Sequence, residues 1–150
     1  MSVGGLTITL PVELRFRAEG FVSTGEAIDA FYANIPLGSA CSKGCGLRSF
    51  GPLPPGGVVV GFGVLSGFGA GAPDPNDPAP NTSIAGQAAV FTADKPGDCG
   101  GDETIKLWIP NPGEGDFNDF LMRACLKGPD LSTAEQLIQT VLASAAPSGA

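Results

Sequence analysis

Two alternating stretches on either side of a polar turn, ETIKLWI (Glu103–Ile109) and DFLMRACLK (Asp119–Lys127), decide the fold of this 150-residue chain. In both stretches apolar side chains recur at every second position, which is typical of a strand with one buried face. The intervening GEGDFND (Gly113–Asp119) consists of turn-forming and polar residues around one Phe. The two stretches are therefore predicted to form an antiparallel β-hairpin with GEGDFND at its tip.

Further strands are expected on the N-terminal side of this hairpin. Residues 6–17, LTITLPVELRFR, alternate between apolar and polar side chains, and Pro11 cannot donate to a sheet ladder, so this segment is predicted to be an edge strand. One strand each is expected near 58–65 and across 82–93. Segment 18–36 fits a strand and a short helix equally well.

The C-terminal part changes to a helical period. Within DLSTAEQLIQTVLASAA, Ser132 is the expected N-cap and Glu135 completes a capping box. An apolar stripe follows, formed by Leu131, Ala134, Leu137, Ile138, Val141, Leu142 and Ala145. A helix over 131–146 is predicted, and its stripe either closes the chain's own core or contacts a partner.

These elements predict one β-rich domain over residues 1–150. Its fold class is mainly β, either an antiparallel sandwich or a jelly-roll-like barrel, with one C-terminal amphipathic helix. A Gly- and Pro-rich loop over 37–57 has no periodicity, and a loop of this length is expected to be functional or to contact a neighbour.

Composition excludes several classes of function. The net charge is −7 and the eight basic residues are scattered, which argues against binding to nucleic acid or to an anionic membrane. The chain has no histidine, so it lacks the commonest general base and transition-metal ligand. No signal peptide or membrane-spanning segment is expected in the chain as given. Only 15% of the residues are charged, which suggests either a surface partly covered by neighbours or a neutral exterior rich in Ser, Thr and Gly.

The four cysteines are Cys41, Cys45, Cys99 and Cys125. A four-thiolate zinc site is disfavoured, because only the first two lie close together in sequence. Disulfides Cys41–Cys45 and Cys99–Cys125 are expected, the second joining the loop before the hairpin to its last strand. Free thiols remain an alternative, since no export signal is visible.

The hairpin tip offers hard oxygen ligands. The stretch DFND resembles the acid-rich DFND loop of bacterial extracellular β-domains that bind calcium. This resemblance implicates Asp116, Asn118 and Asp119 as calcium ligands. The alternative is a turn whose Asp and Asn side chains bond their own backbone.

Two pairs of neighbouring acids could serve as acid–base catalysts. Glu114 with Asp116, and Asp102 with Glu103, are the available pairs. Exposed adjacent acids are usually solvated surface, so this chemistry is disfavoured.

The expected function is a non-enzymatic structural or assembly subunit of a larger particle. We expect a phage capsid decoration or tail component, or an extracellular filament subunit, that binds copies of itself and other structural subunits. Its location would be a virion or an extracellular assembly. Association is expected through segments 2–12 and 41–57, and the expected interface residues are Leu6, Ile8, Leu10, Pro11, Leu137 and Val141. The alternative is a calcium-dependent extracellular β-domain that binds a surface ligand or carbohydrate. No cofactor is expected apart from calcium.

Overall fold

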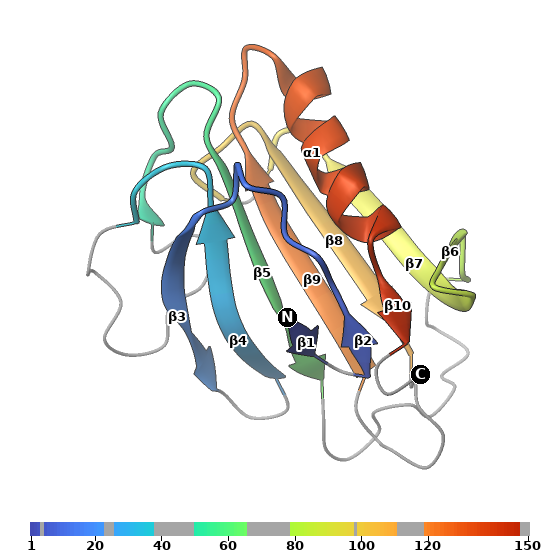
Figure 1. Ribbon diagram of the computed structural model, residues 1–150. Coiled ribbons are helices and arrows are strands. Elements are labelled where there is room, and N and C mark those ends of the chain that lie inside the picture. The colour runs from blue at the N-terminus through green and yellow to red at the C-terminus, as the bar shows by residue number, and fades with distance from the viewer. Residues whose placement is uncertain are drawn as a thin grey trace.

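A computed structural model describes residues 1–3, 5–22, 26–37, 50–65, 79–97, 99–110 and 119–147. Its main element is an antiparallel sheet of seven strands in the order β3-β4-β5-β9-β8-β7-β6 (Figure 1). Its strands are β3 Phe16–Val22, β4 Glu26–Ala33, β5 Val58–Leu65, β6 Thr82–Ile84, β7 Gln87–Asp94, β8 Glu103–Ile109 and β9 Asp119–Leu126.

A smaller layer covers one face of this sheet. It contains helix α1, Leu131–Ala143, and a three-stranded sheet in the order β1-β2-β10. Its short strands are β1 Ser2–Val3, β2 Leu6–Thr7 and β10 Ala146–Pro147. The predicted mainly β class with one C-terminal helix is confirmed. Because the sheets do not close on themselves, the arrangement is an open sandwich and not a barrel.

The hairpin predicted from the alternating stretches is present. Strands β8 and β9 pair antiparallel, with Ile105 opposite Ala124 and Ile109 opposite Phe120. Strand β5 pairs with the other edge of β9, where Phe62 lies opposite Met122. The tip of the hairpin lies outside the described residues, apart from Asp119.

Two apolar cores lie on opposite faces of the large sheet. The first lies beneath α1 and the N-terminal segment and includes Leu6, Ile8, Leu14, Val60, Phe62, Ile105, Leu107, Phe120, Met122, Ile138 and Val141. The second lies on the opposite face, beneath residues 50–53, and includes Ile28, Phe31, Leu53, Val59 and Cys125. The sheet is therefore packed on both faces.

Glycines in β5 let a large side chain approach the backbone. A Cβ at Gly61 would lie 2.6 Å from Cε1 of Phe31, a ring buried in the second core. Phe31 in turn packs edge-on against Phe50, with 5.0 Å between ring centroids. The described end of the long loop therefore packs on the chain's own sheet.

The single edge strand predicted over 6–17 is wrong. The chain forms β2, leaves the sheet, turns at Pro11–Leu14 through a 3.0 Å backbone bond, and enters β3 at Phe16. Ile8 and Leu14 are buried, whereas Val12 is 79% exposed. An irregular segment that returns to the core has thus produced the same alternation as a strand.

The single strand predicted across 82–93 is also wrong, because this segment is a hairpin of β6 and β7. Ala85 and Gly86 form its turn, and both have positive φ, 53° and 78°. Asn81 fixes the entry of β6, since its side chain accepts a bond from Phe91 N and donates to Phe91 O. The ambiguous segment 18–36 forms most of β3 and all of β4.

The predicted helix is confirmed, but its first turn is capped by a different residue. Asp130, and not Ser132, is the N-cap, and its carboxylate accepts bonds from the backbone N–H and the hydroxyl of Thr133. The helix ends at Ala143, three residues before the predicted end. Ala134, Ile138, Val141 and Leu142 are its buried residues.

We expect Ile138→Ala to lower the free energy of unfolding by about 2–5 kcal/mol, because it leaves a cavity in the first core. Gln139→Ala, one position further on the exposed face, is the matched control and should change it by less than about 0.5 kcal/mol. Urea unfolding followed by far-UV circular dichroism measures both values. Equal small losses would contradict the packing of α1 on the sheet.

Candidate functional site

The disulfide predicted between Cys99 and Cys125 is present and crosses 26 residues. It joins the loop between β7 and β8 to strand β9, and Cys125 is buried in the second core. The Thr104 hydroxyl lies 3.3 Å from the Cys99 sulfur. This bond removes two of the four thiols, so a four-cysteine zinc site is excluded. Cys41 and Cys45 lie outside the described residues, and their pairing stays a prediction.

The predicted calcium ligands are only partly described. Asp116 and Asn118 lie outside the described residues, whereas Asp119 begins β9 and is fully buried. One oxygen of Asp119 accepts a 2.8 Å bond from the indole nitrogen of Trp108 on β8. The base of the hairpin thus contains a hydrogen bond to a buried carboxyl group that the sequence alone did not reveal. The calcium site itself stays a prediction.

The acidic pair Asp102–Glu103 is divided between two different environments. Asp102 accepts bonds from the backbone N–H of Gly128 at 2.8 Å and from the Lys127 ammonium at 3.2 Å. These bonds, the Gly128 bond first, lower the pKa of the Asp102 carboxyl. Asp102 therefore stays ionised and fastens the chain after β9 to the start of β8.

Glu103 is the unusual acid of the structure. It begins β8 on the same face as Ile105 and Leu107, beneath α1, and only 1% of it is exposed. Neither of its carboxylate oxygens has a hydrogen-bond partner among the described residues. Burial, and then the charge of Glu135 on α1, raise the pKa of Glu103, while Lys95 opposes them weakly.

A raised carboxyl pKa is common in catalytic acids, but the surroundings of Glu103 do not suit catalysis. A catalytic acid must reach a substrate, and Glu103 is enclosed beneath the helix. Asp102, the neighbouring acid, directs its oxygens to Lys127 and Gly128. The two carboxyls therefore do not face each other across a cleft.

A groove of about 480 Å³ lies between α1 and the ends of β4 and β5. Its walls include Leu137 and Val58, and its polar lining includes Glu13, Asn34 and Asp130. The Asn34 amide bonds the backbone of Gly56 and Val58, and Asp130 caps the helix. Two of these three polar groups are thus already used to hold the chain's own backbone.

Most of the expected interface residues pack against the chain's own first core. Leu6, Ile8 and Val141 are buried in the first core, so their side chains contact the chain's own sheet in this arrangement. Leu10 and Leu137 are partly buried against the same core, and Pro11 is partly exposed at the turn. The apolar stripe of α1 therefore closes the chain's own sandwich.

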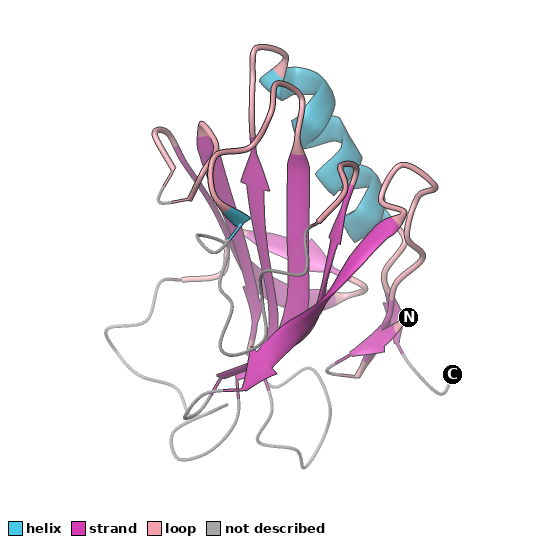
Figure 2. Cartoon of the chain, turned by 90° about the vertical axis from the view of Figure 1, so that its left-hand side faces the viewer, coloured by secondary structure: helices cyan, strands magenta, loops and turns pink. Residues whose placement is uncertain are grey.

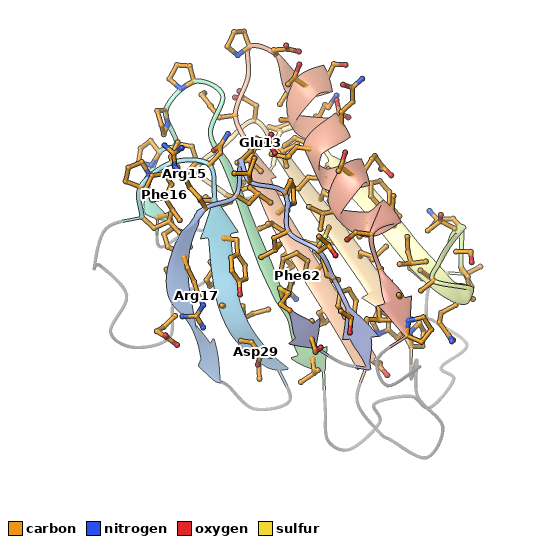
Figure 3. The ribbon with its side chains drawn as sticks, in the orientation of Figure 1. Glu13, Arg15, Phe16, Arg17, Asp29 and Phe62 are labelled. Carbon is orange, nitrogen blue, oxygen red and sulfur yellow. A yellow bond between two sulfur atoms is a disulfide. The ribbon has the colours of Figure 1, made fainter. Side chains whose placement is uncertain are left out.

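Within the described part of the chain, β3 forms an edge of the large sheet that no other strand covers. No strand among the described residues pairs with the outer side of β3, and Figure 2 shows this strand facing the viewer, with no described element in front. Arg17 and Glu19 project from its exposed face and are joined by a 2.7 Å ion pair. Figure 3 shows Arg17 at this edge, away from α1. The opposite edge, β6, has only three residues.

No protein-family model, curated protein or solved structure matches this chain. Among the described residues, no three Cys, Asp or Glu side chains gather into a potential metal site. Within the same part of the chain, no helix has the length and apolar character needed to cross a bilayer.

We expect the double variant Cys99→Ala/Cys125→Ala to lose about 3.5 kcal/mol of unfolding free energy, because a 26-residue loop is no longer closed in the unfolded chain. Chemical denaturation of the parent and of the double variant, both without reductant, measures this loss. Adding a reductant to the double variant is the control, since any further loss must come from Cys41 and Cys45. A double variant as stable as the parent would contradict the stabilising role of this bond.

Glu103 should make the protein less stable as the pH rises. Its pKa is higher in the folded state than in the unfolded chain, so the folded state binds the extra proton. The contribution is fully present below about pH 4.5 and is lost as the pH rises through the raised folded value.

Glu103→Gln, which keeps the shape and removes the charge, should therefore be more stable than the parent at pH 7 and should lose this advantage near pH 4. Urea unfolding between these two values measures the difference. Glu135→Gln is the control, and it should reduce the pH dependence without abolishing it. A pH-independent difference between Glu103→Gln and the parent would contradict the buried position of the carboxyl.

Proposed function

We propose that this chain is a non-enzymatic structural subunit of a larger assembly and that its copies associate through strand β3. The observation that carries the proposal is the seven-residue outer edge of the large sheet, which the rest of the described chain leaves uncovered. An uncovered edge presents a row of N–H and C=O groups that another strand can pair with. Strand β3 overlaps the end of segment 6–17, in which we expected the edge strand.

The chemistry of the described surfaces supports a structural role. The acid with the raised pKa, Glu103, is enclosed beneath α1, and Asp102 fastens two backbone segments together. The polar groups Asn34 and Asp130 of the groove have the same fastening role. Asp102, Asn34 and Asp130 thus hold the chain's own backbone in place, and this use suits a subunit that must keep its shape.

The disulfide supports an assembly that works outside a reducing compartment. Disulfides persist on virion surfaces and in extracellular proteins, and they are rare where glutathione and thioredoxin keep thiols reduced. The Cys99–Cys125 bond therefore favours a virion or an extracellular filament as the setting. A net charge of −7 suits contact with other protein subunits better than contact with nucleic acid.

Light scattering coupled to size-exclusion chromatography should give a mass above that of one chain at high protein concentration, with or without a calcium chelator. Val12→Ser is the matched control, because Val12 is the exposed large apolar residue of the described chain and lies outside β3. This variant should associate like the parent. A monomer at every concentration would contradict the proposal. A monomer that expands when calcium is removed would favour the calcium-binding alternative.

A further inference from the structure

The partner of β3 can be specified further, and this inference rests on the proposed function. We propose that the β3 edge pairs with β3 of a second copy, antiparallel about a two-fold axis through Ala18. In this register Arg17 of each copy lies opposite Glu19 of the other. The sheet of one copy then continues into that of its partner.

Backbone geometry leaves few registers for such a pair. In an antiparallel pair of strands, two residues directly opposite each other either exchange two backbone hydrogen bonds or exchange none. Both residues must therefore direct their backbone N–H and C=O groups toward the partner strand, or both must direct them away from it. Neighbouring residues of β3 direct these groups to opposite sides. A two-fold axis must therefore pass through a residue, and the candidates around the middle of β3 are Arg17, Ala18, Glu19 and Gly20.

Charge selects one of these four. An axis through Arg17 places two arginines opposite each other, and an axis through Glu19 places two glutamates opposite each other. Like charges in directly opposed positions are destabilising, whereas opposite charges contribute favourably. An axis through Gly20 places Glu19 opposite Phe21 and gives no charged pair within β3. Only the axis through Ala18 gives two Arg–Glu pairs, one on each side. Arg17 and Glu19 thus disfavour pairing of this edge in the other registers and favour it in this one.

The side chains are free to make this exchange. The side chain of Arg17 is 49% exposed and that of Glu19 is 76% exposed, and the ion pair between them lies at the surface. Exposed pairs contribute little to stability, so exchanging an intrachain partner for one in the second copy costs little. The two residues also lie on the same face of β3, because they are separated by one position.

On the opposite face of β3, large and small residues of the two copies match. Phe16, Ala18 and Gly20 alternate along it, and Phe16 and Ala18 pack at the margin of the second core. In the proposed register each Phe16 lies opposite Gly20 of the other copy. An aromatic ring across from a glycine covers the backbone that the glycine leaves bare, a pairing that stabilises sheet edges.

A charge-exchange experiment tests the register. Arg17→Glu gives an edge with two glutamates, and Glu19→Arg gives an edge with two arginines. Each variant alone should self-associate about tenfold or more weakly than the parent, because both of its cross-strand pairs become like-charged. An equimolar mixture of the two should associate at least as well as the parent, and so should the double variant Arg17→Glu/Glu19→Arg. Sedimentation velocity measures these equilibria, and urea unfolding checks that each variant is folded.

Cross-linking gives a second readout that detects weak pairing. Opposite Cα atoms in an antiparallel pair lie about 4.5–5.5 Å apart, a separation that a disulfide can span. Ala18→Cys should therefore form a covalent dimer on mild oxidation. Phe16→Cys is the matched control, because its copies would lie about 13 Å apart and should remain uncoupled.

The outcomes separate the two proposals. If the parent associates, both single charge variants associate as strongly as the parent, and Ala18→Cys does not cross-link, this register is wrong and the structural role remains. A parent that remains monomeric, with no cross-link at Ala18→Cys, would overturn both proposals. Cross-linking at Ala18→Cys, with rescue in the mixture of single variants, is the expected result.

Discussion

Strand β9 is buried on both faces, and every layer of the molecule packs against it. Seven of its eight residues are buried. Phe120 and Met122 face the core beneath α1, whereas Cys125 faces the opposite core and carries the disulfide. A strand enclosed in this way must be apolar on both sides, so each polar group on it requires a partner. The indole of Trp108 provides such a partner for Asp119 at the start of the strand.

This constraint explains which parts of the fold were readable from the sequence. The β8–β9 hairpin, the helix and the Cys99–Cys125 bond follow from local periodicity and short chain separations. The break within 6–17 could not be predicted in this way. An irregular segment that buries two side chains, here Ile8 and Leu14, can show the same alternation of apolar and polar residues as a strand. The β6–β7 turn was hidden because one of its two positive-φ residues is Ala85, a residue that rarely adopts this conformation.

The candidate site was less predictable, since its chemistry depends on contacts across layers. Asp102 and Glu103 are both adjacent acids in the sequence, and nothing there distinguishes their roles. Hydrogen bonds from Gly128 and Lys127 lower the pKa of Asp102, whereas burial beneath α1 raises the pKa of Glu103. Whether an acid is reactive, structural or destabilising is decided by the elements above and beside it. The uncovered side of β3 was likewise invisible until the order of strands was known, because an edge is a property of the whole sheet.

The small β1–β2–β10 sheet has a consequence for the connectivity of the fold. It pairs Thr7 with Ala146, and Ser144 bonds the backbone of Thr9 on both its N–H and C=O groups. The beginning and the end of the described chain are thus neighbours in space, and β2 and β10 lie side by side (Figure 1). Circular permutation is tolerated in folds of this kind. The packing of the seven-stranded sheet would then survive a change in where the chain is cut, because it depends on which strands are adjacent and not on which is made first.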